Sequence, residues 1–116
     1  IGAINSGMLV TKEMVKRYPK KVQALVTAHV RATKYLQANP DAWISASAAF
    51  GNKQDILKKA AKNIERNCQI DKEYMSHMKE LAEKMLELKM IDHIPDLNEL
   101  VNTKFLNQAY KEVSKD

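Results

Sequence analysis

Three histidines and one cysteine are the residues of this chain with the best chemistry for binding a metal, and they lie on separate segments. His29, His77 and His93 lack the i, i+4 or Cys-partnered spacing that presents ligands to zinc. Cys68 has no second cysteine with which to form a disulfide or a metal site. We therefore expect no metal and no cofactor. His29 is predicted to be a hydrogen-bonded core residue, His77 and His93 to meet solvent, and Cys68 to fill a small space between helices.

Catalytic residues are also not indicated. A nucleophile needs an adjacent base, and Ser45 and Ser47 lie in an Ala-rich stretch without a glycine-rich elbow, where small residues favour close helix packing. The chain contains neither the G-x-G-x-x-G pattern nor a phosphate-binding loop with Lys and Ser. We expect that it is not an enzyme.

The charge balance is basic. Nineteen Lys and Arg face fourteen Asp and Glu, giving a net charge of +5 and a pI near 9.3. A basic protein invites a nucleic-acid partner, but the cations are mostly Lys, spread along the chain with Glu between them, which is typical of a solvated surface. We expect no nucleic-acid partner. No apolar run approaches the roughly 20 residues needed to span a bilayer, so the chain is not expected to cross a membrane.

The elements that position these residues are predicted to be helices. Hydrophobic spacing predicts helices from Pro19 to the Asn39-Pro40 joint, from there to Phe50, from Lys53 to Asn67, and from Asp71 to about Met90–Asp92. Asp96 is predicted to cap a short turn and Thr103 to cap a last helix. Met8–Val10 has the pattern of a short strand. The expected fold is predominantly α-helical, with about five helices, at most one short N-terminal strand, and a single unit over residues 1–116.

Each helix has an expected buried face. On the first long helix these residues are Val22, Leu25, Val26, His29, Thr33 and Leu36, and on the next they are Trp43, Ala46, Ala49 and Phe50. The later faces comprise Ile56, Leu57, Ala60, Ala61 and Ile64, then Tyr74, Met75, Met78, Leu81, Ala82, Met85 and Leu88, and finally Phe105, Leu106, Ala109 and Val113. Met75, Met78 and Met85 are therefore predicted to pack in a core rather than to line a peptide groove, and Met90 to be exposed. Trp43 is likewise predicted to pack in the core.

Several segments resemble a known family in order and spacing. They are the stretch Lys89-Met90-Ile91-Asp92-His93-Ile94-Pro95-Asp96-Leu97, the following Leu100-Val101-Asn102-Thr103-Lys104-Phe105-Leu106, and the upstream Gly7-Met8-Leu9-Val10-Thr11-Lys12-Glu13, Tyr18-Pro19-Lys20-Lys21-Val22, Ala28-His29-Val30-Arg31-Ala32-Thr33 and Ala38-Asn39-Pro40-Asp41-Ala42-Trp43. Together they resemble the C-terminal part of ABC-transporter solute-binding proteins of the nitrate/sulfonate/taurine and thiamine-precursor class.

The resemblance implies a fold and partners. Members are two-lobed α/β proteins more than twice this length, and the chain begins at Ile1 without an initiator Met or a secretion signal, so we expect a C-terminal fragment. It implies an extracytoplasmic location, a small solute (a sulfonate, nitrate, taurine or a pyrimidine-like compound) and an ABC permease as partners. Asn5 and Ser6 are the most plausible ligand-facing positions, although a turn role explains them equally well; the ligand-binding residues are otherwise left unknown.

A rival hypothesis needs no transporter. The strongly amphipathic last two helices suit a self-contained basic helical module that docks a partner protein through an apolar face. A chain that leaves such a face uncovered is also expected to self-associate.

Overall fold

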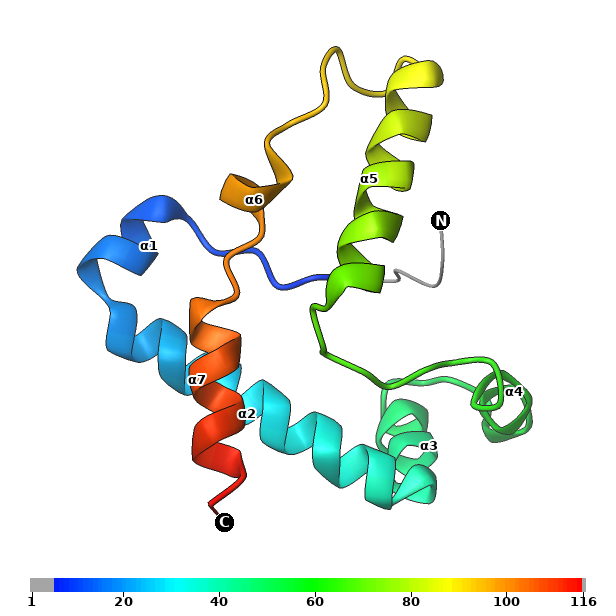
Figure 1. The fold of residues 1–116 in the computed structure, drawn as a ribbon. Helices are drawn as coiled ribbons and strands as arrows, with labels where there is room; N and C mark the ends of the chain where they lie inside the picture. Colours follow the sequence, from blue (N-terminus) through cyan, green and yellow to red (C-terminus); the bar gives the residue numbers. More distant parts are fainter. Residues whose placement is uncertain (1–5, 116) are drawn as a thin grey trace.

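The computed structural model describes residues 6–115, which form seven helices and no strand (Figure 1). The helices are α1 (Lys12–Arg17), α2 (Pro19–Ala38), α3 (Pro40–Ala49), α4 (Gln54–Ala60), α5 (Lys72–Glu87), α6 (Leu97–Leu100) and α7 (Lys104–Val113). The expectation of a predominantly α-helical fold is confirmed. Met8–Val10 form neither helix nor strand, because a lone strand is not stable and the described residues offer it no partner.

A short helix that the sequence analysis did not foresee precedes the first long one. The hydroxyl of Thr11 accepts a hydrogen bond from the backbone N–H of Met14 at 3.1 Å and so caps α1. Arg17 pairs with Glu13 one turn earlier, at 2.8 Å. Pro19 then opens α2 at its first position, where its missing N–H costs nothing.

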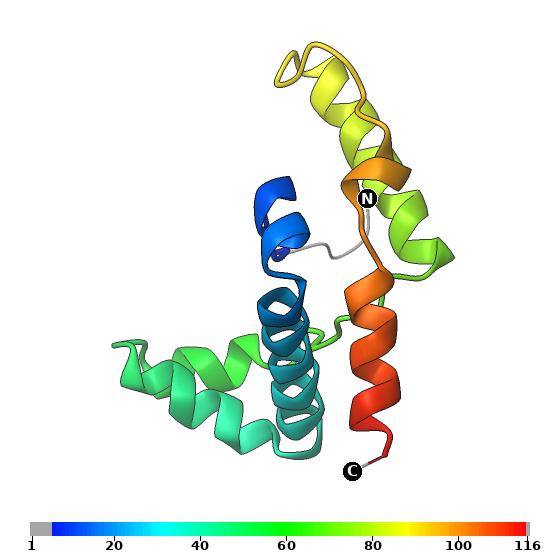
Figure 2. The ribbon, with the colours of Figure 1, turned by 90° about the vertical axis from the view of Figure 1, so that its left-hand side faces the viewer.

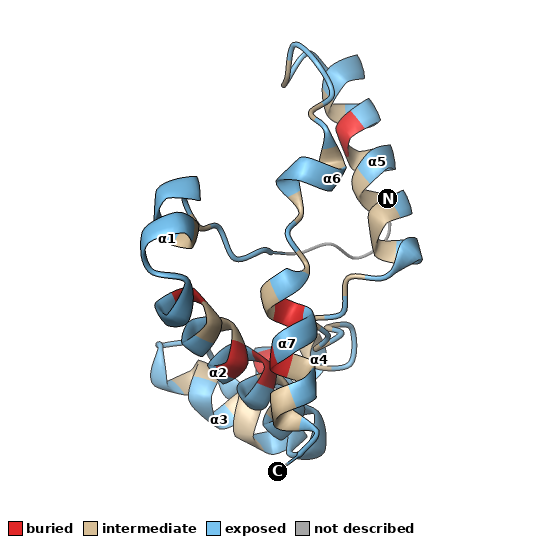
Figure 3. Ribbon diagram, turned by 60° about the vertical axis from the view of Figure 1, so that its left-hand side comes forward, coloured by how far each residue is buried: buried red, intermediate tan, exposed pale blue. Residues whose placement is uncertain are grey.

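The core lies between α2 and α7, which run side by side (Figures 2 and 3). Val30 and Ala109 are fully buried there, and Leu106 is nearly so. The small side chain of Ala109 leaves room for close approach of the two helices. Around these three pack the half-buried side chains of Val26, Cys68, Ile70, Tyr110 and Val113.

Polar contacts flank this core and fix the register of α7 on α2. The Thr27 hydroxyl donates to the Glu112 carboxylate at 2.9 Å, and the Gln23 side-chain amide donates to the backbone carbonyl of Phe105, also at 2.9 Å. Gln108 donates to the other oxygen of Glu112 at 3.1 Å. These hydrogen bonds hold the pKa of Glu112 below its usual value of 4.5.

The expected buried face of α2 was partly right: Val22 is buried, and Val26, Thr33 and Leu36 are half-buried. Leu25, at 54% exposed, and His29 were wrong, and Thr27 and Val30 are buried instead. This side of the face is shifted by about one residue because α7 packs against Val26 and Val30 and hydrogen-bonds Thr27.

The expected helix from Lys53 to Asn67 is shorter in the structure. It ends at Ala60, and residues 61–71 turn back toward the core. The Gln37 side chain holds this return by donating to the backbone carbonyl of Arg66, and Cys68 packs against the core. Tertiary packing thus outweighs the helical pattern of the sequence.

The caps of the last helices agree with expectation in two of three cases. Asp71 accepts from the Tyr74 N–H at 2.8 Å to cap α5, and Asp96 accepts from the Asn98 N–H at 2.9 Å to cap α6. Thr103 makes no capping hydrogen bond; the carboxamide oxygen of Asn102 accepts from the Lys104 N–H at 3.0 Å instead. The α5 helix ends at Glu87, slightly before the predicted position.

The α5–α6 hairpin projects from the rest of the molecule (Figure 1). We call residues 71–100 the arm and the remaining described residues the body. Among the helices, α5 contacts α6, whereas α2 contacts α1, α3 and α7 and α3 contacts α4. The radius of gyration is 16.4 Å, compared with about 13 Å for a compact domain of this length. The chain is therefore expanded by its arm.

Candidate functional site

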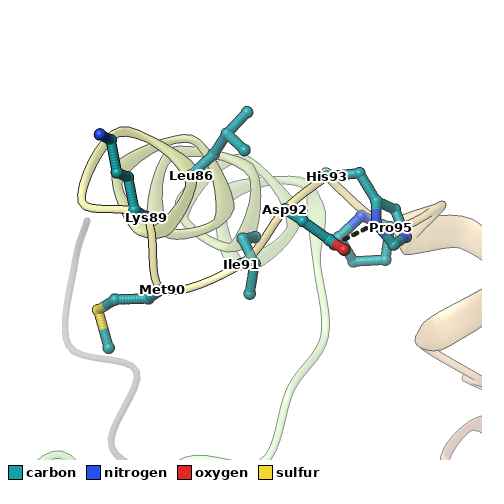
Figure 4. A pocket seen from close by; sticks show the side chains of 7 residues that line it. All are labelled: Leu86, Lys89, Met90, Ile91, Asp92, His93 and Pro95. Carbon is teal, nitrogen blue, oxygen red and sulfur yellow. Dashed lines mark hydrogen bonds and ion pairs between the residues drawn. The ribbon is translucent and has the colours of Figure 1, made fainter.

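The end of the arm carries an open depression, and it is built by the way α5 ends (Figure 4). Lys89 adopts a left-handed backbone conformation, with φ of 57°. Its N–H donates to the Leu86 carbonyl at 3.0 Å, and the Met90 N–H donates to the Met85 carbonyl at 2.8 Å. This is the Schellman arrangement that ends many helices, here with Lys where glycine is usual.

The depression has a volume of about 840 Å³ and is open to solvent. Its lining is mainly apolar with three charged or polar side chains, and consists of Leu86, Lys89, Met90, Ile91, Asp92, His93 and Pro95. Small-molecule sites usually enclose most of their ligand. An open apolar hollow with charges beside it is better suited to receiving a side chain from another protein surface.

The polar side chains at the depression do not converge on one point (Figure 4). His93 hydrogen-bonds its neighbour Asp92, and both side chains are largely exposed, at 78% and 93%. Within residues 6–115, no three His, Cys, Asp or Glu side chains come close enough to hold a metal ion. The depression therefore provides an open surface for contact, with its charged side chains at the rim.

The other chemistry-bearing residues of the sequence are dispersed. His29 is exposed on α2, so its expected place in the core was wrong; His93 is exposed as expected, and His77 is half-buried on α5. Ser45 is exposed and Ser47 half-buried on α3. Asn5 lies outside the described residues. Ser6 is exposed and is not among the residues that line the depression at the end of the arm.

Trp43 does not pack in the way the sequence analysis expected. It is half-buried, but Phe50 on the same side of α3 is 88% exposed. The Arg66 guanidinium carbon lies 5.6 Å from the centre of the Trp43 ring, a cation–π contact. Two buried nitrogens of Arg66 have no hydrogen-bond partner within the described part of the chain. Sequence reasoning missed this pair because no local pattern links residues on different elements.

Cys68 occupies the small space between helices that was predicted for it. It is half-buried against the core, with its sulfur 3.2 Å from the Tyr110 hydroxyl. Burial is the main cause that raises the pKa of Tyr110, and the contact with Cys68 adds to it. This pair is a packing feature of the core.

The methionines of α5 match expectation only in part, because Met75, Met78 and Met85 do not belong to the buried core. Met75, Met78 and Met85 are half-buried, and Met90 is 66% exposed at the end of the arm. A second, smaller depression of about 470 Å³ lies at the base of the arm, where Met75 approaches Val101 and Thr103.

A basic cluster at the junction of α1 and α2 was underestimated by the sequence analysis. We define it as the exposed cations Lys12, Lys16, Arg17, Lys20 and Lys21. The exposed ring of Tyr18 lies among them, with the Lys21 ammonium at 4.9 Å and the Arg17 guanidinium at 5.6 Å from its centre. The run Lys-Arg-Tyr-Pro-Lys-Lys was visible in the sequence. Only the structure shows that its cations gather around the Tyr18 ring where α1 ends and α2 begins.

Comparisons with protein-family models, curated proteins and solved structures gave no match to this chain. Within residues 6–115 no helix combines the length and the apolar character needed to cross a bilayer.

Proposed function

We propose that this chain is a scaffolding segment of the extracytoplasmic substrate-binding component of an ABC importer. The observation that carries the proposal is the surface that the chain leaves uncovered. Its accessible area is 9147 Å², compared with about 6,400 Å² for a compact monomer of this mass. Helices with this much uncovered surface are suited to packing against further protein.

The class of protein comes from the sequence resemblance. The segments that resemble the solute-binding family include the whole end of the arm, Lys89–Leu97, and the entry into α7, Leu100–Leu106. In such proteins two lobes close around a solute, and the closed form is recognised by the permease. The proposed solute is a sulfonate, nitrate, taurine or a pyrimidine-like compound, and the role is binding rather than catalysis.

Solute binding by the natural polypeptide that contains this sequence tests the proposal. Titration calorimetry with taurine, nitrate and an aminopyrimidine should show binding of at least one compound by that polypeptide. The 116-residue chain alone should bind none of them, because its depressions are open. Two results would overturn the proposal: tight binding by the isolated chain, or no binding by the natural polypeptide to any of the three classes.

A second candidate is a self-contained basic helical module that binds a partner protein. The specific observation in its favour is the row of exposed apolar side chains on the arm: Leu86, Leu88, Met90, Ile94 and Leu100. The same titration separates the two candidates, since a module of this kind has no solute to bind in any length of chain.

A further inference from the structure

The charges of this chain are divided between its two structural parts. Residues 71–100, the arm, contain four Lys and eight Asp or Glu, whereas the other 86 residues contain fifteen Lys or Arg and six Asp or Glu. The arm is therefore acidic and the body strongly basic, although the net charge of +5 hides the division. Opposite potentials on two surfaces of one molecule favour contact between copies.

Nine of the thirteen large hydrophobic residues that are exposed in the described chain fall on the same two regions; the other four, Leu25, Tyr35, Phe50 and Ile56, lie elsewhere on the body. Of the large hydrophobic residues that are exposed in the described chain, one group lies just before and within the basic cluster: Met8, Leu9, Met14 and Tyr18. A second group lies on the arm: Leu86, Leu88, Met90, Ile94 and Leu100. Both regions thus combine apolar side chains with an excess of one charge, acidic on the arm and basic at the cluster, although Lys79–Glu83, Lys84–Glu87 and Arg17–Glu13 also pair within their own region. Apolar side chains beside charged ones are the composition of a protein interface with an apolar centre and a polar rim.

The placement of the two regions permits a reciprocal contact. Helix α1 and the arm both project from the same end of the α2–α7 pair, and in Figure 1 they stand on opposite sides of that end. Figure 2 also shows both above α2 and α7. A two-fold axis through this end would place the basic cluster of each copy opposite the arm of the other. Such a contact buries two identical pairs of surfaces, as two-fold dimers do.

We propose that two copies of this chain associate through reciprocal contacts between the acidic arm of one and the basic α1–α2 junction of the other. The uncovered area is sufficient. A stable interface needs about 800 Å² from each partner, and the chain exposes about 2,700 Å² more than a compact monomer of its mass. The association concerns the chain itself and requires no solute, so its test is independent of the transport role.

Charge reversal on each surface gives a direct test by sedimentation velocity. One variant carries Glu83→Lys and Glu87→Lys, which lie one turn apart on α5, and the other carries Lys16→Glu and Lys20→Glu at the basic cluster. At low salt the wild-type chain should form a dimer in a series from micromolar to submillimolar concentration. Each variant alone should dimerise at least about tenfold more weakly, since the two substitutions bring the net charge of that surface to about zero and place like charges opposite each other at the substituted positions.

Mixing the two variants supplies the decisive result. In the mixed dimer one contact joins the unaltered arm to the unaltered cluster, and the other joins the two altered surfaces, whose substituted positions carry opposite charges. Dimerisation should therefore return, as it also should in a single chain that carries all four substitutions. A control matched to the basic-cluster variant, Lys58→Glu with Lys59→Glu on α4, makes the same change in net charge as that variant but away from this surface, and should leave the dimer unchanged. Far-UV circular dichroism of each variant checks that the helices are retained.

Three outcomes would overturn the proposal. The wild-type chain could remain monomeric throughout the series, the two variants could fail to restore each other, or the α4 control could weaken association as much as the others. Association that disappears after nuclease treatment would assign the basic cluster to nucleic acid instead and would equally overturn it.

Discussion

At the scale of single residues, Lys89 stores backbone strain at the end of α5. Its φ of 57° is costly for any residue with a Cβ, by roughly 1–2 kcal/mol, and the Schellman hydrogen bonds around it favour glycine. Lys89→Gly should therefore raise the free energy of unfolding by about 0.5–1 kcal/mol, part of the gain being offset by the greater freedom of glycine in the unfolded chain. Urea denaturation followed by circular dichroism measures it.

The control for this position is Lys89→Ala, which removes the same side chain but keeps a Cβ. It should give no gain. If Lys89→Gly instead lowers stability, the lysine side chain contributes more to the end of the arm than its backbone conformation costs.

Glu112 gives the fold a dependence on pH. Hydrogen bonds from Gln108 and Thr27 are the main cause that lowers its pKa below 4.5 in the folded state, with Arg31 and Lys115 adding to it. A carboxyl whose pKa is depressed on folding stabilises the protein above its unfolded pKa, and this contribution is lost as the pH falls through the folded pKa. Stability should therefore decrease as the pH falls below about 4.5.

Glu112→Gln should flatten that part of the pH profile, because the substituted side chain does not titrate. Thermal unfolding between pH 3 and 7, in roughly unit steps, measures the effect. Glu99→Gln removes an exposed carboxylate on another helix, α6, and should leave the slope as in the wild type. If stability falls with decreasing pH as steeply in Glu112→Gln as in the wild type, another group causes the loss of stability in acid.

At the scale of elements, the packing of α7 against α2 determines which face of α2 is buried. Val30→Ala should lower the free energy of unfolding by about 2 kcal/mol, because it removes two methyl groups from a fully buried position. Leu25→Ala on the same helix should cost less than about 0.5 kcal/mol, since Leu25 is half exposed. Urea midpoints of the two variants compare these faces directly, and equal losses would contradict the observed packing.

The same pair of residues shows how far sequence reasoning reaches in this protein. Helical periodicity predicted α2, its boundaries at Pro19 and Asn39, and the caps at Asp71 and Asp96, because these depend on local chemistry. It could not choose between the neighbouring faces marked by Leu25 and Val30. That choice depends on α7, more than seventy residues away along the chain, whose contacts include the hydrogen bond from Thr27 to Glu112.

The candidate surfaces show the same division between local and distant information. The end of the arm overlaps the contiguous segment Lys89–Leu97 that the sequence analysis singled out, although it did so for a family resemblance and did not predict the depression. The pairing of Trp43 with Arg66 was not, and neither was the early end of α4. Each depends on the return of residues 61–71 to the core, which no local pattern in the sequence specifies.

At the scale of the whole molecule, the arm and the body differ in how much packing supports them. Helices α2 and α7 pack together around the fully buried side chains of Val30 and Ala109. Helix α5 contacts only α6 among the described helices, and Ala82 is its one buried residue. An isolated helix of the length of α5 is marginal in water. Hydrogen exchange should therefore report lower protection in α5 than in α2 and α7, by about 2 kcal/mol or more in opening free energy.

This difference also connects local stability with association between copies. In dilute, high-salt solution, where charge attraction is screened, arm amides should exchange by local opening that leaves the α2–α7 core protected. Val30→Ala should then weaken protection in α2 and α7 and leave α5 little changed, because the two parts share few contacts. If the arm is covered by a second copy, its protection should rise with protein concentration at low salt, whereas protection in α2 and α7 should change less. Uniform protection across arm and body in dilute solution would instead mean that the molecule opens as one cooperative unit.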